Sequence, residues 1–84
     1  MLLEESGCVL VKDAPDRKVW KRENTYSTDT YVFTKVDSVW YAGTRTEVVD
    51  LMDGGTHEVP TMLTSHTCAM IQEYLQALIR GEVA

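Results

Sequence analysis

Short runs of apolar and β-branched residues, separated by turn-forming residues, fill the first two thirds of the chain. Such runs favour the pleated, half-buried surface of a strand. Runs at this spacing are typical of an antiparallel meander, so we predict four or five strands within residues 8–59. The runs are "CVLVK" (8–12), "RKVWKRENTY" (17–26), "TYVFTK" (30–35), "VWYA" (39–42), "TEVVDLM" (46–52) and "THEV" (56–59).

The turn-forming residues indicate where these strands end. Pro15 suits the second position of a type I turn in "DAPD". "VDS" predicts a tight turn at Val36-Asp37, and Gly43-Thr44 fits a two-residue hairpin loop. "DGG" is the strongest turn signal in the chain and predicts a loop at Asp53-Gly54. Pro60 then ends the pairing of the last strand.

The last third of the chain changes to a helical period. Thr64 or Ser65 can cap the start of a helix, and Gly81 can take the left-handed position after its end. The pattern predicts a helix over about residues 65–80, long enough at roughly 24 Å to cross one face of the sheet. One apolar stripe recurs at three- and four-residue spacing: Cys68, Ile71, Leu75, Leu78 and Ile79.

Together these patterns predict an α+β fold. We expect one small domain spanning residues 1–84, in which an antiparallel β-meander of four or five strands carries one C-terminal α-helix on one face.

The predicted turns also distribute the side chains between the two faces of the sheet. One face gathers mostly aliphatic residues and is the expected surface for the helix: Val39, Tyr41, Val48, Met52 and Val59. The other face gathers aromatic residues: Trp20, Tyr31, Phe33 and Trp40. Large exposed aromatic patches usually mark interfaces, which makes these four residues candidate partner-binding residues. Alternatively, the N-terminal segment "MLLEESGCVLV" folds across them, and the sequence leaves both interpretations open.

The charge of the chain points to the kind of partner. Thirteen acidic residues against eight basic ones give a net charge of −5, which argues against a general binder of nucleic acid or of anionic membranes. A protein partner with a basic surface fits better, and Glu47, Asp50 and Asp53 are the candidate acidic contacts. Self-association as a homodimer would use the same aromatic face. We also expect Asp50 to lie opposite His57 as a cross-strand ion pair.

No arrangement of catalytic or metal-binding residues stands out. Cys8, Cys68, His57 and His66 lack the Cys-x-x-Cys or His-x-x-x-His spacing of a metal site. Cys68 falls in the first helical turn, where a thiol can become reactive, but it also begins the apolar stripe, where core packing explains it. We therefore expect no catalytic residue, metal or cofactor, no enzymatic activity, and two reduced, partly buried thiols.

One basic segment supports a second interpretation. In "RKVWKR", strand alternation places Lys18, Trp20 and Arg22 on one face. An aromatic ring flanked by cations is how small β-domains hold single-stranded nucleic acid. The alternative function is therefore a small β-domain that binds single-stranded nucleic acid through these three residues.

The leading interpretation is a small, acidic, non-catalytic protein-binding module. The chain shows neither a secretory signal nor the ~20 apolar residues needed to span a membrane, so we expect a cytoplasmic protein without membrane contacts. In size and charge it resembles phage-encoded inhibitors of host defence, such as anti-CRISPR and anti-restriction proteins. The resemblance implies a viral inhibitor of a host defence protein or a nucleic-acid-handling protein.

Overall fold

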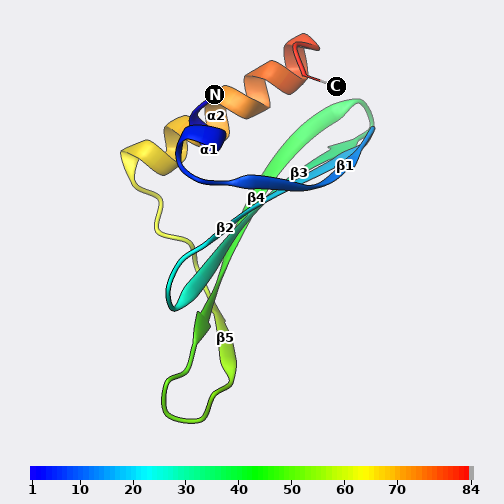
Figure 1. Ribbon diagram of the computed structural model, residues 1–84. Helices are drawn as coiled ribbons and strands as arrows, with labels where there is room; N and C mark the ends of the chain where they lie inside the picture. Colours follow the sequence, from blue (N-terminus) through cyan, green and yellow to red (C-terminus); the bar gives the residue numbers. More distant parts are fainter. Residues whose placement is uncertain (84) are drawn as a thin grey trace.

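A computed structural model, which describes residues 1–83, shows a five-stranded antiparallel sheet with a C-terminal helix packed on it (Figure 1). The α+β meander predicted from the sequence is therefore confirmed. The elements are α1 (Leu2–Glu5), β1 (Val9–Ala14), β2 (Arg17–Glu23), β3 (Ser27–Val36), β4 (Val39–Val49), β5 (Thr56–Val59) and α2 (Ser65–Arg80).

The strands lie side by side in the order in which they occur in the chain, β1-β2-β3-β4-β5. The two central strands, β3 and β4, are the longest, with 10 and 11 residues. Helix α2 crosses one end of the sheet, while β5 and the end of β4 project from the other end (Figure 1). The sheet therefore has a covered half and a half that extends beyond the helix.

Two of the predicted turns lie at or next to their expected positions. Pro15 and Asp16 connect β1 to β2, between the paired residues Ala14 and Arg17. Asp37 and Ser38 connect β3 to β4 with φ values of 50° and 66°, one residue later than predicted. Positive φ at both central residues is the type I′ geometry, whose twist matches that of the flanking strands.

The predicted turn at Gly43-Thr44 is wrong. Gly43 pairs with Val32 and Thr44 with Tyr31, in the middle of a ladder that runs unbroken from Val36↔Val39 to Ser27↔Val48. Because the Asp37–Ser38 turn starts this ladder, each further residue of β4 gains a partner on β3. A second turn at Gly43-Thr44 would break most of those pairs. Gly43 sits in a regular strand without the positive φ that would favour glycine.

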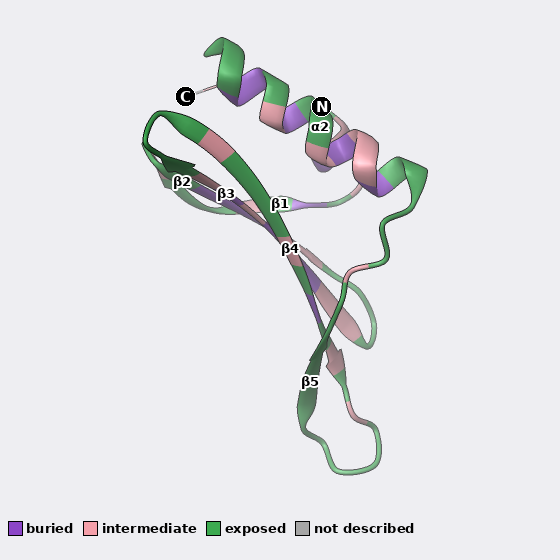
Figure 2. Ribbon diagram, turned by 180° about the vertical axis from the view of Figure 1, so that it is seen from behind, coloured by how far each residue is buried: buried purple, intermediate pink, exposed green. Residues whose placement is uncertain are grey.

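The core lies between the sheet and α2 and is centred on Tyr74. The Tyr74 ring meets Trp20 edge-on at 5.3 Å between centroids and Phe33 at 4.7 Å. Such edge-to-face pairs add to the stabilisation from burial itself. The buried positions follow α2 and the strands beneath it (Figure 2). The core residues are Leu3, Cys8, Trp20, Tyr31, Phe33, Met70, Tyr74 and Leu78.

The four aromatic residues share one face of the sheet, as predicted, but α2 covers this face and not the opposite one. Tyr31 and Phe33 are 1% and 0% exposed beneath α2, and Trp40 is half-buried against the same core. Tyr41 and Val39, which were expected under the helix, are 58% and 50% exposed. The error follows from the false turn at Gly43-Thr44, because folding β4 back there transfers Val48 and the residues after it to the face of Val39 and Tyr41.

The N-terminal segment also covers the aromatic residues. Of the two interpretations left open by the sequence, cover by this segment therefore agrees with the structure better than an exposed aromatic interface does. Leu3 of α1 is fully buried and Cys8 is 5% exposed, both within the core. The backbone N–H of Leu2 donates to Glu73 Oε1 of α2 at 2.7 Å, which holds the two helices together. Helix and N-terminal segment thus share the aromatic face between them.

Helix α2 has the predicted length but turns a different side to the sheet. Met70, Tyr74 and Leu78 face the core, whereas Ile79 is 65% exposed. Tyr74 decides this orientation because its ring fits between two aromatic residues of the sheet, a contact that aliphatic spacing does not reveal. Thr64 caps the helix by accepting from the Thr67 N–H at 3.1 Å, and Gly81 follows its end with φ 71°, as predicted.

Candidate protein-binding surface

The residues with potential reactivity are dispersed. Cys8 and Cys68 are both free thiols, and burial raises the pKa of the Cys8 thiol, which disfavours the reactive thiolate form. Among residues 1–83, no group of three or more His, Cys, Asp or Glu side chains is arranged to hold a metal ion.

One contact that the sequence did not indicate joins Ser6 to His66. Ser6 Oγ and His66 Nε2 lie 2.7 Å apart at the surface, where α1 ends and α2 begins. Within the described chain, no carboxylate holds the other ring nitrogen of His66, so the third member of a hydrolytic triad is missing. The pair ties α1 to α2.

The residues proposed for nucleic-acid binding share a face, as strand alternation predicted, but this face is covered. Lys18 is 3% exposed and its ammonium is paired with Asp13. Trp20 is 6% exposed beneath Tyr74, so no base could stack on it. Arg22 is bound to Asp29 at 2.9 Å. This geometry gives the alternative function no support.

Asp29 organises a polar cluster at the edge of the core. Its carboxylate accepts hydrogen bonds from Thr46 at 2.7 Å, Arg22 at 2.9 Å and Asn24 at 3.1 Å. Burial alone would raise the pKa of Asp29, but these three hydrogen bonds outweigh it and leave the pKa below its usual value. The cluster joins β2, β3 and β4 where the sheet leaves the cover of α2.

The three predicted acidic contacts all lie in the part of the sheet beyond the helix. We call residues 46–60 the arm, which comprises the end of β4, the connecting loop and β5. Glu47 and Asp53 are exposed, and Asp50 forms the expected pair with His57, at 3.1 Å. His57 nevertheless lies opposite Val48 rather than Asp50 in the strand register. The role of these acids in binding a partner stays a prediction.

The arm also exposes apolar side chains at its tip, in a loop where the sequence pattern predicts a strand. Leu51 is 71% exposed and Met52 is 95% exposed. Their loop is held in shape by short bonds from backbone to side chain, including Gly55 N–H to Asp53 Oδ1 at 2.7 Å. No Lys or Arg occurs between Arg45 and Arg80, so the tip combines apolar side chains with uncompensated acids.

No helix within residues 1–83 covers the sheet face opposite α2, and we call it the open face. Its charges lie in two neighbouring rows. The strand register places Glu23, Thr28, Glu47 and Glu58 side by side, which forms the acidic row. One step along the strands, Lys21, Thr30 and Arg45 form the basic row. No ion pair joins the two rows within the described residues.

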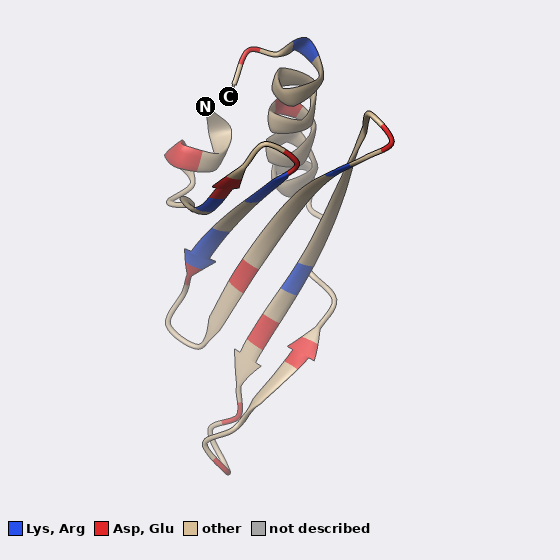
Figure 3. Cartoon of the chain, turned by 90° about the vertical axis from the view of Figure 1, so that its right-hand side faces the viewer, with Lys and Arg blue, Asp and Glu red and all other residues tan. Residues whose placement is uncertain are grey.

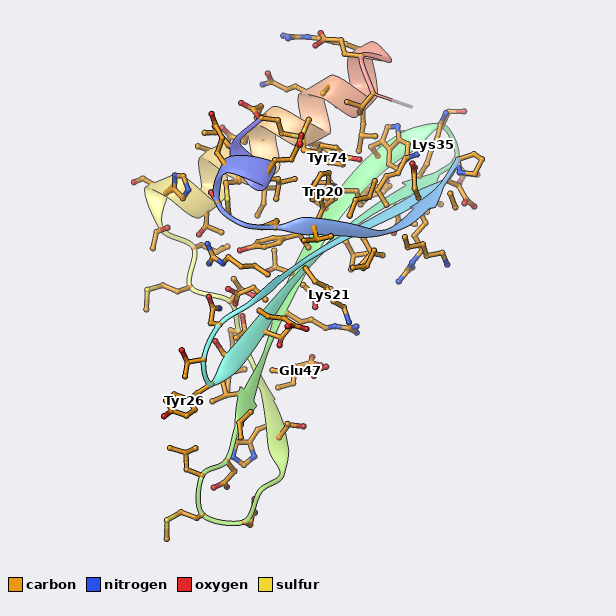
Figure 4. The ribbon with its side chains drawn as sticks, in the orientation of Figure 1. Trp20, Lys21, Tyr26, Lys35, Glu47 and Tyr74 are labelled. Atoms are coloured by element: carbon orange, nitrogen blue, oxygen red, sulfur yellow. The ribbon has the colours of Figure 1, made fainter. Side chains whose placement is uncertain are left out.

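The charged side chains of the open face point away from the core. Figure 3 marks the charged positions along the backbone, and on β4 a basic position is followed by an acidic one toward the arm. In Figure 4, Lys21 and Glu47 point away from α2, whereas Trp20 and Tyr74 meet between the sheet and the helix. Sequence reasoning missed both rows because they require the true register of four strands. The charges of Lys21, Glu23, Arg45 and Glu58 could be read from the sequence, but their alignment across the strands could not.

The chain matches no known protein family, no curated protein and no solved structure. None of the helices within residues 1–83 is sufficiently long and apolar to cross a bilayer. The surfaces described above are therefore the basis on which a function can be proposed.

Proposed function

We propose that this chain is a non-catalytic protein-binding module whose arm binds a partner with a basic surface. The observation that carries the proposal is the arm itself, which extends beyond the helix-covered half of the sheet and exposes Leu51 and Met52 at its tip (Figure 1). Exposed apolar side chains ringed by polar residues are typical of interaction sites.

The acidic residues of the arm select the partner. Glu47, Asp53 and Glu58 are exposed and have no described ion-pair partner, and the Asp50–His57 pair offsets a charge only when His57 is protonated. Such a surface attracts a positively charged one and speeds their association. In its more specific form, the proposal is that the arm occupies the basic groove of a nucleic-acid-handling protein, as a phage-type inhibitor of host defence would. The two free thiols suit a reducing compartment, so we expect this to occur in the cytoplasm.

The experiment compares affinity isolation by the wild type, a tip variant and a control variant. The tip variant carries Leu51→Ser and Met52→Ser, and the control carries Ile79→Ser, which alters a similarly exposed apolar residue on α2. We expect one basic protein to be retained by the wild type and the control, to be lost with the tip variant, and to be released as salt rises. A partner retained equally by all three chains would remove the arm from the proposal.

A further inference from the structure

The acidic and basic rows of the open face are arranged so that the face complements itself. On β4, Arg45 and Glu47 belong to neighbouring rows, and on β2, Lys21 and Glu23 do the same. The row between them, Arg22, Asp29 and Thr46, turns its side chains to the other face. A two-fold axis along this middle row exchanges the basic row of one copy with the acidic row of another.

We propose that a second copy of this chain packs on the open face, with the strands of the two copies antiparallel across the interface. Arg45 of each copy then faces Glu47 of the other, and Lys21 faces Glu23. This is an isologous interface, in which one patch serves both subunits. Two twisted sheets that pack face to face cross at an angle, so contacts far from the two-fold axis are displaced most. The two charged rows lie on either side of the axis, so these contacts are displaced least.

The apolar residues beside the two rows follow the same symmetry. If residue 45 faces residue 47, then Gly43 faces Val49 of the second copy. A Cβ atom at Gly43 would meet no heavy atom within 4 Å, so there is open space above this position on the open face. Val49 is 39% exposed and Tyr41, two residues before Gly43 on β4, is 58% exposed. The second copy would cover all three.

The chain has surface to spare for such a contact. A standard interface buries about 800 Å² of each partner, roughly a seventh of the 5544 Å² that one copy exposes. A dimer formed through the open face does not depend on the identity of the arm's partner. It would engage Glu47 and cover the rest of the acidic row, so the arm's partner would bind the two exposed tips, each with Leu51, Met52 and Asp53.

The test is a charge exchange measured by sedimentation at low salt over a range of protein concentrations. Arg45→Glu and Glu47→Arg each place like charges across the interface, so each variant alone should dimerise at least tenfold more weakly than the wild type. An equimolar mixture of the two should recover the dimer, because a carboxylate then faces a guanidinium at both ends of the interface. The double variant R45E/E47R should recover it as well.

Two control variants make the same changes of charge elsewhere. Arg80→Glu lies on α2 and Glu5→Arg on α1, both exposed and away from the open face. Both should dimerise like the wild type. A wild type that stays monomeric at every concentration overturns the proposal. So does a mixture that associates no better than its separate components, because recovery by exchange requires that residues 45 and 47 face each other.

Discussion

Asp29 shows how one residue can fix several strands at once. It lies on β3 and accepts hydrogen bonds from Arg22 on β2, from Asn24 in the following turn and from Thr46 on β4. Because Asp29 is only 7% exposed, the charge of its carboxylate is tolerated only with these partners in place. Thr46 in turn lies 2.9 Å from Thr61 Oγ1, which anchors the segment leading to α2.

Replacing Asp29 by Asn should destabilise the fold by roughly 1 to 3 kcal/mol at pH 7, because Arg22 loses its partner. The folded-state pKa of Asp29 is lowered. Its contribution to stability is therefore present above the usual carboxyl pKa of about 4 and is lost as the pH falls through the folded-state value. Thermal melting from pH 7 to pH 2 should show the wild type and variant converging in acid. A gap independent of pH, or an equal effect of Asp16→Asn in the exposed β1–β2 turn, would contradict this role.

Gly43 gives the opposite prediction from the one that the sequence suggested. A turn glycine resists substitution, but this glycine lies in mid-strand with open space where a side chain would be. Gly43→Thr should therefore leave the fold intact and stabilise the monomer by up to about 1 kcal/mol, since threonine favours strands and glycine does not. Melting of the variant at low concentration measures this. A loss of several kcal/mol in the free energy of unfolding would instead support the turn that the sequence predicted at Gly43-Thr44.

Among the elements, α2 is the one whose ends the sequence defined best. Of the two candidate caps, Thr64 accepts the hydrogen bond from the Thr67 N–H, and the side chain of Ser65 is exposed. Thr64→Ala should cost about 1 kcal/mol of stability, whereas Ser65→Ala should cost little. Urea denaturation of the two variants compares them directly. Equal losses would mean that the cap is shared.

Other elements were predicted less well, for reasons that are specific to each. The presence of the strands and the turn at Pro15 follow from local residue preferences, which can be read directly from the sequence. The faces of β4 depend on whether Gly43 bends the chain, and only the long pairing with β3 settles that. The orientation of α2 depends on Tyr74. A tyrosine has both an apolar ring and a polar hydroxyl, so the sequence alone does not show that this ring packs between Trp20 and Phe33. The tip of the arm could be recognised as a turn, but its distance from the helix could not.

The molecule as a whole is extended for its length. Its radius of gyration is 13.6 Å, against about 12 Å expected for 84 residues. Its exposed area of 5544 Å² exceeds the roughly 5,000 Å² expected of a compact monomer of this mass. The long dimension is 45 Å. Because α2 crosses one end of the sheet, the core lies at that end, and β5, whose residues are all exposed, is held at the other end by its pairing with β4.

This division predicts two levels of hydrogen exchange. Amides of β3 beneath α2 should exchange only on global unfolding, whereas those of β5 should exchange through local opening, at least tenfold faster. The Arg45→Glu variant is the suitable sample, because the proposed dimer would not contribute to protection. Exchange measured by mass spectrometry resolves the two regions. Equal protection of β3 and β5 would show that the arm is part of one cooperative unit.

The placement of the two tryptophans has a spectroscopic consequence. Trp20 lies under the middle of α2, while Trp40 is half-buried near its end, beside a small cavity lined by Leu78 and Ile79 and with Lys35 Nζ 6.0 Å from its ring centroid. Fluorescence from Trp20 should be blue-shifted and shielded from iodide, and that from Trp40 redder and open to quenching. Replacing either one by phenylalanine would leave a single emitting indole at a known position. Its emission wavelength during denaturation would then report whether the end of the helix lifts from the sheet before the middle does.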